Sequence, residues 1–194
     1  MNFPILSSLI LLPAVGALFL FFTRSNKENN ITVKYVALFT SLVNFFLSVY
    51  LWILFDQSTS EFQFVEDRVW IKDLINYKVG IDGISILFII LTTFITPLCI
   101  ISVNNSIKNR LSEFLIAILI MESFMIGVFC SLDLVVFYLF FEAGLIPMFL
   151  IIGIWGGTRR VYSAFKFFLF TLLGSVLMLI AIISIYWISG TTDV

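Results

Sequence analysis

Charged residues, histidine and cysteine are all scarce in this sequence, and each scarcity excludes a class of protein. Charged residues make up 12% of the 194 residues, whereas apolar residues make up 61%. A soluble domain carries about 25% charged residues, and a water-soluble fold of this size cannot bury so much apolar surface. The composition therefore predicts an integral membrane protein. The net charge of −1 gives no indication of nucleic-acid binding.

The lack of histidine and the scarcity of cysteine limit the chemistry that the chain can perform. Without histidine, a proton relay must use carboxylates, lysines, hydroxyls or water. The two cysteines, Cys99 and Cys130, lie in apolar segments without metal-ligand spacing, and we interpret them as small buried hydrophobic residues. There is also no phosphate-binding glycine loop. We therefore expect the chain to bind no metal, no redox centre and no other cofactor.

Six apolar runs are long enough to cross a bilayer as helices, since a hydrocarbon core of about 30 Å needs roughly 20 residues. The first run lacks a basic leader and a small-residue cleavage site, so we expect a membrane span there and not a cleaved signal. The sequence thus predicts an all-α membrane protein with six transmembrane helices, at residues 3–22, 33–55, 84–103, 113–131, 132–155 and 164–188.

The distribution of basic residues predicts the orientation of these helices. Eight of the eleven lysines and arginines fall in or beside the turns after the first, third and fifth runs: Arg24, Lys27, Lys34, Lys108, Arg110, Arg159, Arg160 and Lys166. The opposite face has Arg68, Lys72 and Lys78, mixed with acidic residues such as Asp73. We therefore expect the basic face in the cytoplasm or the mitochondrial matrix, with both ends of the chain outside. Arg159 and Arg160 are interpreted as determinants of this topology.

The segment 56–83 between the second and third runs is the one sizeable piece expected outside the membrane. Its apolar residues recur every second position, which predicts a short hairpin on the outer face. Asp82 precedes the third helix, where a carboxylate meets free N–H groups and the positive end of the helix dipole. We interpret Asp82 as a helix cap, with a role in transport as the alternative.

Glu142 is the most informative residue, because every other residue in 135–155 is apolar, glycine or proline. A carboxylate at membrane depth costs roughly 2.5–3.5 kcal/mol on insertion scales, so it is normally retained for ion or proton movement or for pairing with a polar group. Pro147 follows five residues later and removes a backbone hydrogen bond, which predicts a break or kink of the helix. This combination indicates a proton path.

A second carboxylate, Glu122, is predicted to lie at the same depth. The turn near Asp133 is so short that the helices on either side must be antiparallel neighbours. Glu122 lies eleven residues before Asp133 and Glu142 nine after it, which places both about 13–17 Å from the turn. If the two carboxylates are close, one must hold a proton near neutral pH. Alternatively, Glu122 and Glu142 each satisfy a hydroxyl or backbone group within the bundle.

Lys166, at the start of the sixth run, has two possible orientations. Its long side chain can extend to the membrane surface, which its position favours. It can instead turn inward and stabilise the ionised form of Glu142 as an opposite charge. Glu142, Glu122 and Lys166 are therefore the candidate proton-transfer residues.

Four stretches of the sequence together resemble one known family. FEAGLIPMFLIIGIWGG at 141–157 resembles the fifth-helix signature of subunit M of proton-pumping NADH–quinone oxidoreductase, respiratory complex I, called chain 4 in mitochondria. The third, fourth and sixth helices of the same family are resembled, in order and spacing, by 79–101, 121–142 and 164–182. Residues 1–78 match by span pattern only. We therefore divide the chain into 1–78, two helices and the outer loop, and 79–194, the start of the antiporter-like unit.

The resemblance implies that the chain couples electron transfer from NADH to quinone, in other subunits, to proton translocation. Glu142 matches the essential fifth-helix glutamate of the family, and Glu122 and Lys166 match further positions of its pattern. NADH, FMN, iron–sulfur clusters and quinone are expected in partner subunits, and the other membrane subunits and the lipid bilayer are the expected partners. The expected location is the bacterial inner membrane, or alternatively the mitochondrial inner membrane.

The family chain is longer, with about fourteen helices, so the resemblance implies an N-terminal portion that lacks the later lysines and does not translocate protons alone. An unpaired Glu142 would then stay protonated. Two other functions stay open. One is a chain of a cation/proton antiporter with the same fold, and the other is a membrane scaffold whose glutamates only pack.

Overall fold

The computed structural model describes residues 4–23, 30–71, 75–103, 107 and 110–193. Six helices in these ranges are long and apolar enough to cross a membrane, which confirms the predicted multi-pass membrane protein. Some of the charged residues from which the membrane orientation was predicted lie outside the described ranges: Arg24, Lys27, Lys72, Asp73 and Lys108. The helices are α1 (Ile5–Thr23), α2 (Asn30–Leu54), α3 (Ser85–Ser102), α4 (Leu111–Cys130), α5 (Leu134–Trp155) and α6 (Arg160–Ser189).

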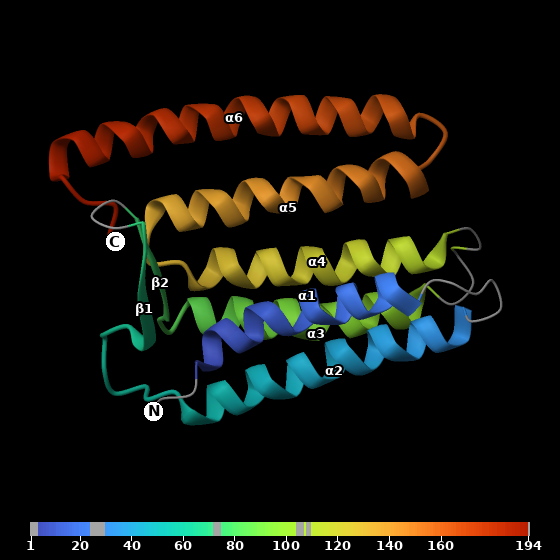
Figure 1. Ribbon diagram of the computed structural model, residues 1–194, viewed down its shortest axis with the longest axis horizontal. Helices are drawn as coiled ribbons and strands as arrows, with labels where there is room; N and C mark the ends of the chain where they lie inside the picture. The colour runs from blue at the N-terminus through green and yellow to red at the C-terminus, as the bar shows by residue number, and fades with distance from the viewer. Residues whose placement is uncertain (1–3, 24–29, 72–74, 104–106, 108–109, 194) are drawn as a thin grey trace.

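The six helices lie side by side, and α4 is at the centre of the bundle (Figure 1). Helix α4 packs against α1, α2, α3 and α5, whereas α6 packs against α5 at one edge. The most crowded approach between α4 and α5 is at Gly127, where an added Cβ would lie 2.6 Å from the ring of Phe140. A residue without a side chain is therefore needed there, because it lets the two backbones come together.

Two apolar clusters form the core, one at each end of the bundle. The first includes Leu9, Ile86 and Ile126 and continues into the residues beneath the hairpin, and the second includes Leu20 and Leu119. Each cluster combines side chains from three or more elements. Helices α1, α2, α3 and α4 each contribute residues to both clusters, so the core lies between these four helices.

The predicted hairpin is present at the end of the bundle where α1 begins and α6 ends (Figure 1). Strand β1 (Gln63–Ile71) pairs antiparallel with β2 (Ile75–Ile81). The register is irregular between Gln63 and Glu66, beside Phe64, whose φ of 54° lies in the left-handed region. The fold class is thus confirmed as six membrane-spanning helices with a short hairpin at one end.

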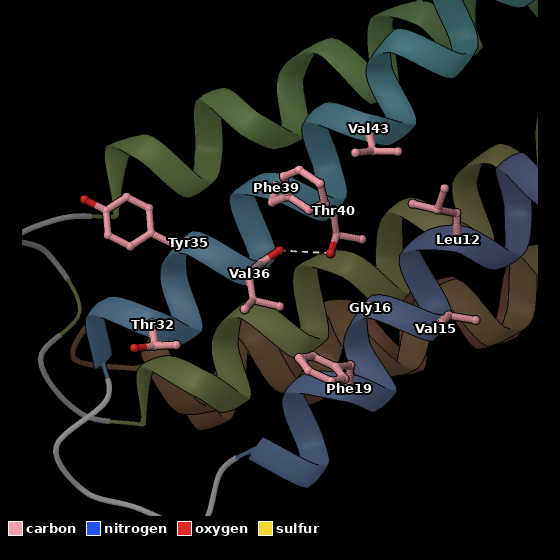
Figure 2. Close-up of a pocket in the computed structure, with 10 residues that line it drawn as sticks. All are labelled: Leu12, Val15, Gly16, Phe19, Thr32, Tyr35, Val36, Phe39, Thr40 and Val43. Atoms are coloured by element: carbon pink, nitrogen blue, oxygen red, sulfur yellow. Dashed lines mark hydrogen bonds between the residues drawn. The ribbon is translucent and has the colours of Figure 1, made fainter.

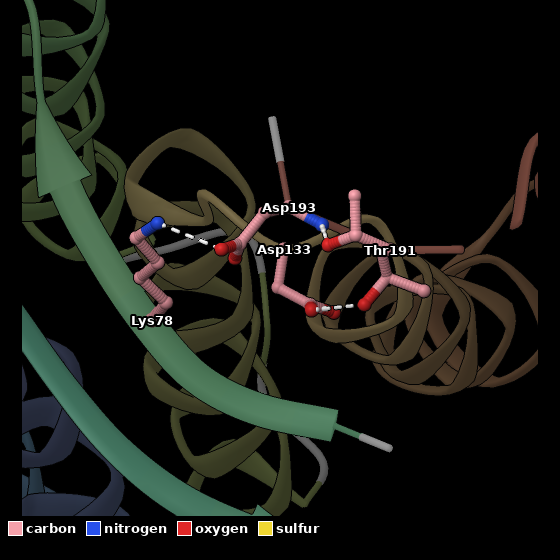
Figure 3. Close-up of polar contacts among 5 residues, drawn as sticks. Lys78, Asp133, Thr191 and Asp193 are labelled. Carbon is pink, nitrogen blue, oxygen red and sulfur yellow. Dashed lines mark hydrogen bonds and ion pairs between the residues drawn. The ribbon is translucent and has the colours of Figure 1, made fainter. Parts of the chain in front are cut away.

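Chain segments far apart in sequence join the hairpin to the helix ends. The N–H of Leu132, in the turn between α4 and α5, donates to the carbonyl of Lys78 in β2 at 3.0 Å. The N–H of Leu134 donates to the carbonyl of Thr192, beyond α6, at 2.9 Å. Figure 3 shows the side chains that add to this junction: Lys78 pairs with Asp193 at 3.0 Å, and Asp133 accepts the hydroxyl of Thr192.

Asp82 and Asp133 satisfy backbone groups at two helix N-termini. Asp82 Oδ1 accepts the N–H of Ser85, the first residue of α3, at 2.7 Å, which is the capping contact that the sequence predicts. Asp133 is the cap of α5, where its Oδ1 accepts the N–H groups of Val135 and Val136. The first N–H groups of a helix have no partner within the helix, so each carboxylate compensates for part of that deficit.

Helix α6 begins four residues before the predicted apolar run, because the less apolar segment 160–163 ahead of Ala164 is also helical. Its first residue, Arg160, donates from Nη1 to the carbonyl of Ile154 at 2.6 Å, near the C-terminus of α5. A cation at that position also meets the negative end of the α5 dipole. Arg160 therefore helps to fix the turn between α5 and α6.

The outward surface of the bundle is apolar. A groove of about 660 Å³ lies between α1 and α2. Figure 2 shows the residues that line it: Leu12, Val15, Gly16, Phe19, Thr32, Tyr35, Val36, Phe39, Thr40 and Val43. The hydroxyl of Thr40 donates to the carbonyl of Val36 on its own helix, so the groove presents a surface suited to lipid. The prediction that both cysteines are buried is wrong for Cys99, which is exposed on α3, whereas Cys130 is buried.

Candidate functional site

Glu122 lies at the centre of the bundle and is bound to a residue that the sequence analysis missed. Its side chain is 2% exposed, and its Oε1 accepts a hydrogen bond of 2.9 Å from Nδ2 of Asn44, on α2. Asn44 is 0% exposed. An amide in the middle of an apolar span is itself a signal, because polar groups in membrane helices normally pair across helices. The pairing partner could not be read from sequence spacing.

Asn44 belongs to a row of buried polar residues on one face of α2. Ser41, Asn44 and Ser48 recur at helical spacing and all three are fully buried. The hydroxyls of Ser48 and Thr93, on α3, lie 2.7 Å apart, and Ser123 of α4 donates to the carbonyl of Ile10 on α1 at 2.6 Å. The polar groups therefore link α1, α2, α3 and α4 around Glu122.

Glu142 lies on the side of α5 that faces away from α4. Phe140 and Gly144 mark the α4-facing side, because Phe140 abuts Gly127 and a Cβ on Gly144 would lie 3.9 Å from Phe124. Two residues of helix turn the direction of a side chain by about 200°, so Glu142 points away from both contacts. Its side chain is half-buried, and Oε2 is buried without a hydrogen-bond partner among the described residues.

The opposite side of α5 packs on α6. Phe149 follows Glu142 by seven residues and therefore lies on the same face of α5. The centroid of its ring lies 5.5 Å from that of Phe165 and 5.5 Å from that of Phe168. A Cβ added to Gly153 would lie 3.5 Å from Ala164. These contacts place Glu142 on the face of α5 that is turned to α6.

The same contacts give the register of the two antiparallel helices. Glu142 lies eleven residues before Gly153, and Ser175 lies eleven residues after Ala164. Ser175 is therefore level with Glu142, and it is one of the few buried residues of α6. Its hydroxyl donates to the carbonyl of Leu172 at 2.9 Å. Ser175 is the polar side chain that α6 brings to the depth of Glu142.

Glu122 and Glu142 lie at the same depth in the bundle, but their side chains point in different directions. Glu122 lies eight residues before the end of α4 at Cys130, and Glu142 eight residues after the start of α5 at Leu134. Both are thus about 12 Å from the turn between the helices. However, Glu122 is directed to Asn44 in the interior, whereas Glu142 is directed to α6. The chain does not bring these two carboxylates together.

Lys166 is exposed on α6 and distant from both glutamates. It follows Ala164 by two residues, so it lies on the side of α6 that faces away from α5. It also lies nine residues, about 13 Å along the helix, from the level of Ser175 and Glu142. This position matches the surface orientation considered from the sequence and not the inward one.

Pro147 lies within α5, which continues as one helix from Leu134 to Trp155. The chain does not leave the helical path at this residue. Because proline has no N–H, the carbonyl of Ala143 lacks the hydrogen bond that an ordinary residue at position 147 would donate. Within the described residues, no group of three or more acidic, cysteine or histidine side chains could hold a metal ion.

Comparisons with known proteins confirm the predicted resemblance. A family described as NADH:quinone oxidoreductase/Mrp antiporter, transmembrane, matches residues 131–194. NADH-quinone oxidoreductase subunit M of Rhodobacter capsulatus is 59% identical over 161 residues, which cover 83% of this chain and 31% of that protein. NADH-ubiquinone oxidoreductase chain 4 of Marchantia polymorpha is 48% identical over 190 residues, which cover 97% and 38%. The chain thus spans about a third of the length of these relatives.

Solved structures agree with the sequence relatives. A chain of respiratory complex I from Thermus thermophilus superposes with a TM-score of 0.81 and 28% identity, covering 97% of this chain and 38% of that one. A chain of the Mrp complex from Dietzia superposes with a TM-score of 0.77 over 97% of this chain and 20% of that one. Its identity is 16%, so this match shows the fold alone. The six helices therefore have the antiporter-like membrane fold.

Proposed function

We propose that this relative of subunit M and chain 4 acts as a membrane subunit of a proton-pumping NADH–quinone oxidoreductase, with Glu142 as a proton-transfer residue. The observation that carries the proposal is the 59% identity to subunit M of Rhodobacter capsulatus. In this function the chain is a non-redox part of a translocase. Electron transfer takes place in other subunits, which hold NADH, FMN, the iron–sulfur clusters and quinone, and the neighbouring membrane subunits are its partners.

The surroundings of Glu142 support its role. A carboxylate oxygen buried at membrane depth is costly unless it is paired or protonated. Glu142 Oε2 has no partner among the described residues, and α6, which packs on this face of α5, brings Ser175 to the same depth. A half-buried carboxylate without a fixed partner can take up and release a proton with little rearrangement of its neighbours.

Glu122 and Lys166 have different support. Glu122 is enclosed and bound to Asn44, so proton exchange with Glu142 would need intermediate groups across the contact between α4 and α5. Lys166 lies near the membrane surface, on the face proposed as cytoplasmic. We therefore assign the main proton-transfer step to Glu142. We also propose that the protein lies in the bacterial inner membrane, with its hairpin outside. The mitochondrial inner membrane is the alternative location.

A cation/proton antiporter chain is the second candidate. The family that matches residues 131–194 favours it, because its description names the Mrp antiporter beside NADH:quinone oxidoreductase. The two functions differ in the driving reaction, which is NADH oxidation in one and an existing ion gradient in the other.

The decisive experiment measures proton pumping in membrane vesicles with Glu142→Gln in the intact protein. NADH should drive acidification in the wild type and in the matched control Glu61→Gln, whose site is in the exposed outer loop. Glu142→Gln should abolish most of this pumping while the complex remains assembled. Unchanged pumping would remove Glu142 from the path. Transport that follows an imposed sodium or proton gradient and ignores NADH would favour the antiporter.

A further inference from the structure

Two oxygen atoms in the middle of the bundle lack hydrogen-bond partners, and they belong to residues that are already bonded to each other. Asn44 Nδ2 donates to Glu122 Oε1 at 2.9 Å. Asn44 Oδ1 and Glu122 Oε2 are both buried and have no partner among the described residues. Both side chains end in a planar group with two polar atoms, so a coplanar pair joined through Nδ2 and Oε1 would set Oδ1 beside Oε2.

The two unpaired atoms are both oxygens, and a proton between them would satisfy both. Both are acceptors when Glu122 is ionised, and two acceptors at close range repel each other. If Glu122 carries a proton on Oε2, the resulting O–H can donate to Asn44 Oδ1. One added proton would thus satisfy both unpaired atoms. A flip of the Asn44 amide does not have this effect, because Nδ2 would then donate to Oε2 and leave Oε1 and Asn44 Oδ1 without partners.

We propose that Asn44 and Glu122 form a cyclic amide–carboxylic acid pair in which Glu122 holds a proton at neutral pH. Asn44 is then a positioning residue that recognises the neutral acid by donating to its carbonyl oxygen and accepting from its hydroxyl. This inference does not depend on the proposed function, since it concerns the pair itself.

The charges around Glu122 agree with a neutral acid. Helix α1 has no titratable side chain. The titratable groups on the other elements that pack against α4 are Lys34, Tyr35 and Tyr50 on α2, Cys99 on α3, Tyr138 and Glu142 on α5, and Tyr77 and Lys78 on β2. Of the two cations, Lys34 lies ten residues, about 15 Å, from Asn44 along α2, and Lys78 pairs with Asp193 at the hairpin end of the bundle. Glu142 is directed to α6. An ionised Glu122 would therefore be a buried charge without a nearby counter-ion, which is strongly unfavourable.

Both members of the pair are buried in the bundle: Glu122 is 2% exposed and Asn44 is 0% exposed. The proton on Glu122 is therefore shielded from bulk water, and its release requires Oε2 to separate from the amide. The pair is suited to hold a proton and to resist its exchange.

Infrared difference spectroscopy on the intact protein in lipid vesicles tests the proposal. The spectrum of the wild type minus that of Glu122→Gln should show the carbonyl band of one protonated carboxylic acid at neutral pH. Glutamine keeps the shape of glutamate and can make both hydrogen bonds to Asn44 without a titratable proton, so it is a conservative reference. Bands of an ionised carboxylate in this difference spectrum would overturn the proposal.

Exchange of the two groups gives a stricter test. Asn44→Asp combined with Glu122→Gln places the acid on α2 and the amide on α4 and preserves the pair. This double variant should regain the protonated-acid band that Glu122→Gln lacks, and a carboxylate band in its place would contradict the pairing. Ser48→Ala is the matched control, because Ser48 is equally buried on the same face of α2 but bonds Thr93, and it should leave the band of Glu122 unchanged.

Discussion

Glu66, in the hairpin, accepts the backbone N–H of Leu6, at the start of α1, at 2.9 Å. The two residues are sixty positions apart. The same carboxylate accepts the N–H of Ser7 at 3.3 Å and the Ser7 hydroxyl. Because the first turn of a helix leaves its N–H groups without partners, Glu66 supplies an acceptor for them from the hairpin. The hairpin is therefore bound to the bundle by a charged group at a helix N-terminus.

Replacement of Glu66 by alanine should destabilise the protein by about 0.5–2 kcal/mol, the usual range for loss of a helix cap. Thermal unfolding in detergent measures the change. Glu61→Ala removes a carboxylate from the exposed part of the same loop and should have a much smaller effect. Equal effects of the two substitutions would show that the cap does not stabilise α1.

Two glycines in the contact between α4 and α5 should respond differently to a methyl group. Gly127→Ala should destabilise by about 1–3 kcal/mol, because the new Cβ would overlap the rigid ring of Phe140 at 2.6 Å. Gly144→Ala should have little effect, since its Cβ would meet Phe124 at an ordinary 3.9 Å. The melting temperatures of both variants in one detergent give the comparison. A stable Gly127→Ala protein would mean that the helices separate easily.

The contribution of Asp82 should depend on pH. Hydrogen bonds from the Ser85 side chain and backbone N–H hold the pKa of Asp82 below its ordinary value. A carboxyl whose pKa is lowered in the folded state stabilises that state above the unfolded pKa of about 4, and the stabilisation is lost as the pH falls through the folded pKa. The stability difference between the wild type and Asp82→Asn should therefore shrink on acidification. Chemical unfolding at several pH values tests this, and a constant difference would contradict it.

The ion pair between Lys78 and Asp193 should contribute little. Its atoms are 3.0 Å apart, but both side chains are partly exposed. Such pairs contribute about 0–1 kcal/mol. A double-mutant cycle with Lys78→Ala and Asp193→Ala should give a coupling energy in this range that decreases with added salt. A larger, salt-independent coupling would show that the pair is shielded from water.

Glu122→Gln and Glu142→Gln should act independently on stability, because the two side chains lie on opposite sides of the contact between α4 and α5. Distant sites without shared partners add within about 0.3–0.5 kcal/mol. Unfolding of the single and double variants measures the deviation. A coupling of more than about 1 kcal/mol would show that the carboxylates interact, as direct neighbours do.

The sequence was sufficient to predict the spans, because length and hydropathy define a membrane helix without reference to its neighbours. The equal depth of Glu122 and Glu142 also followed from spacing, since helix rise is constant and the turn is short. The direction of each side chain did not follow, because it depends on how a helix is rotated against its neighbours. Glu122 and Asn44 are separated by 78 positions in the sequence, and only the packed structure reveals their hydrogen bond.

The early start of α6 was missed for a different reason. Hydropathy locates the apolar part of a helix, whereas the helix itself continues wherever its backbone bonds continue. Arg160 and Ser163 are polar yet helical. The capping contact of Asp82 was predictable, because a cap lies beside the helix that it serves.

The junction at the hairpin end also has a dynamic consequence. The amide of Leu132 bonds to the hairpin, and the amide of Leu134 bonds to the segment beyond α6. Hydrogen exchange at either amide requires separation of segments that belong to different parts of the chain. Neighbouring amides linked in this way tend to exchange through one shared opening. The end of the bundle that carries the hairpin should thus fluctuate as a single cooperative unit. A displacement of α5 would then also displace β2 and the segment at the end of α6.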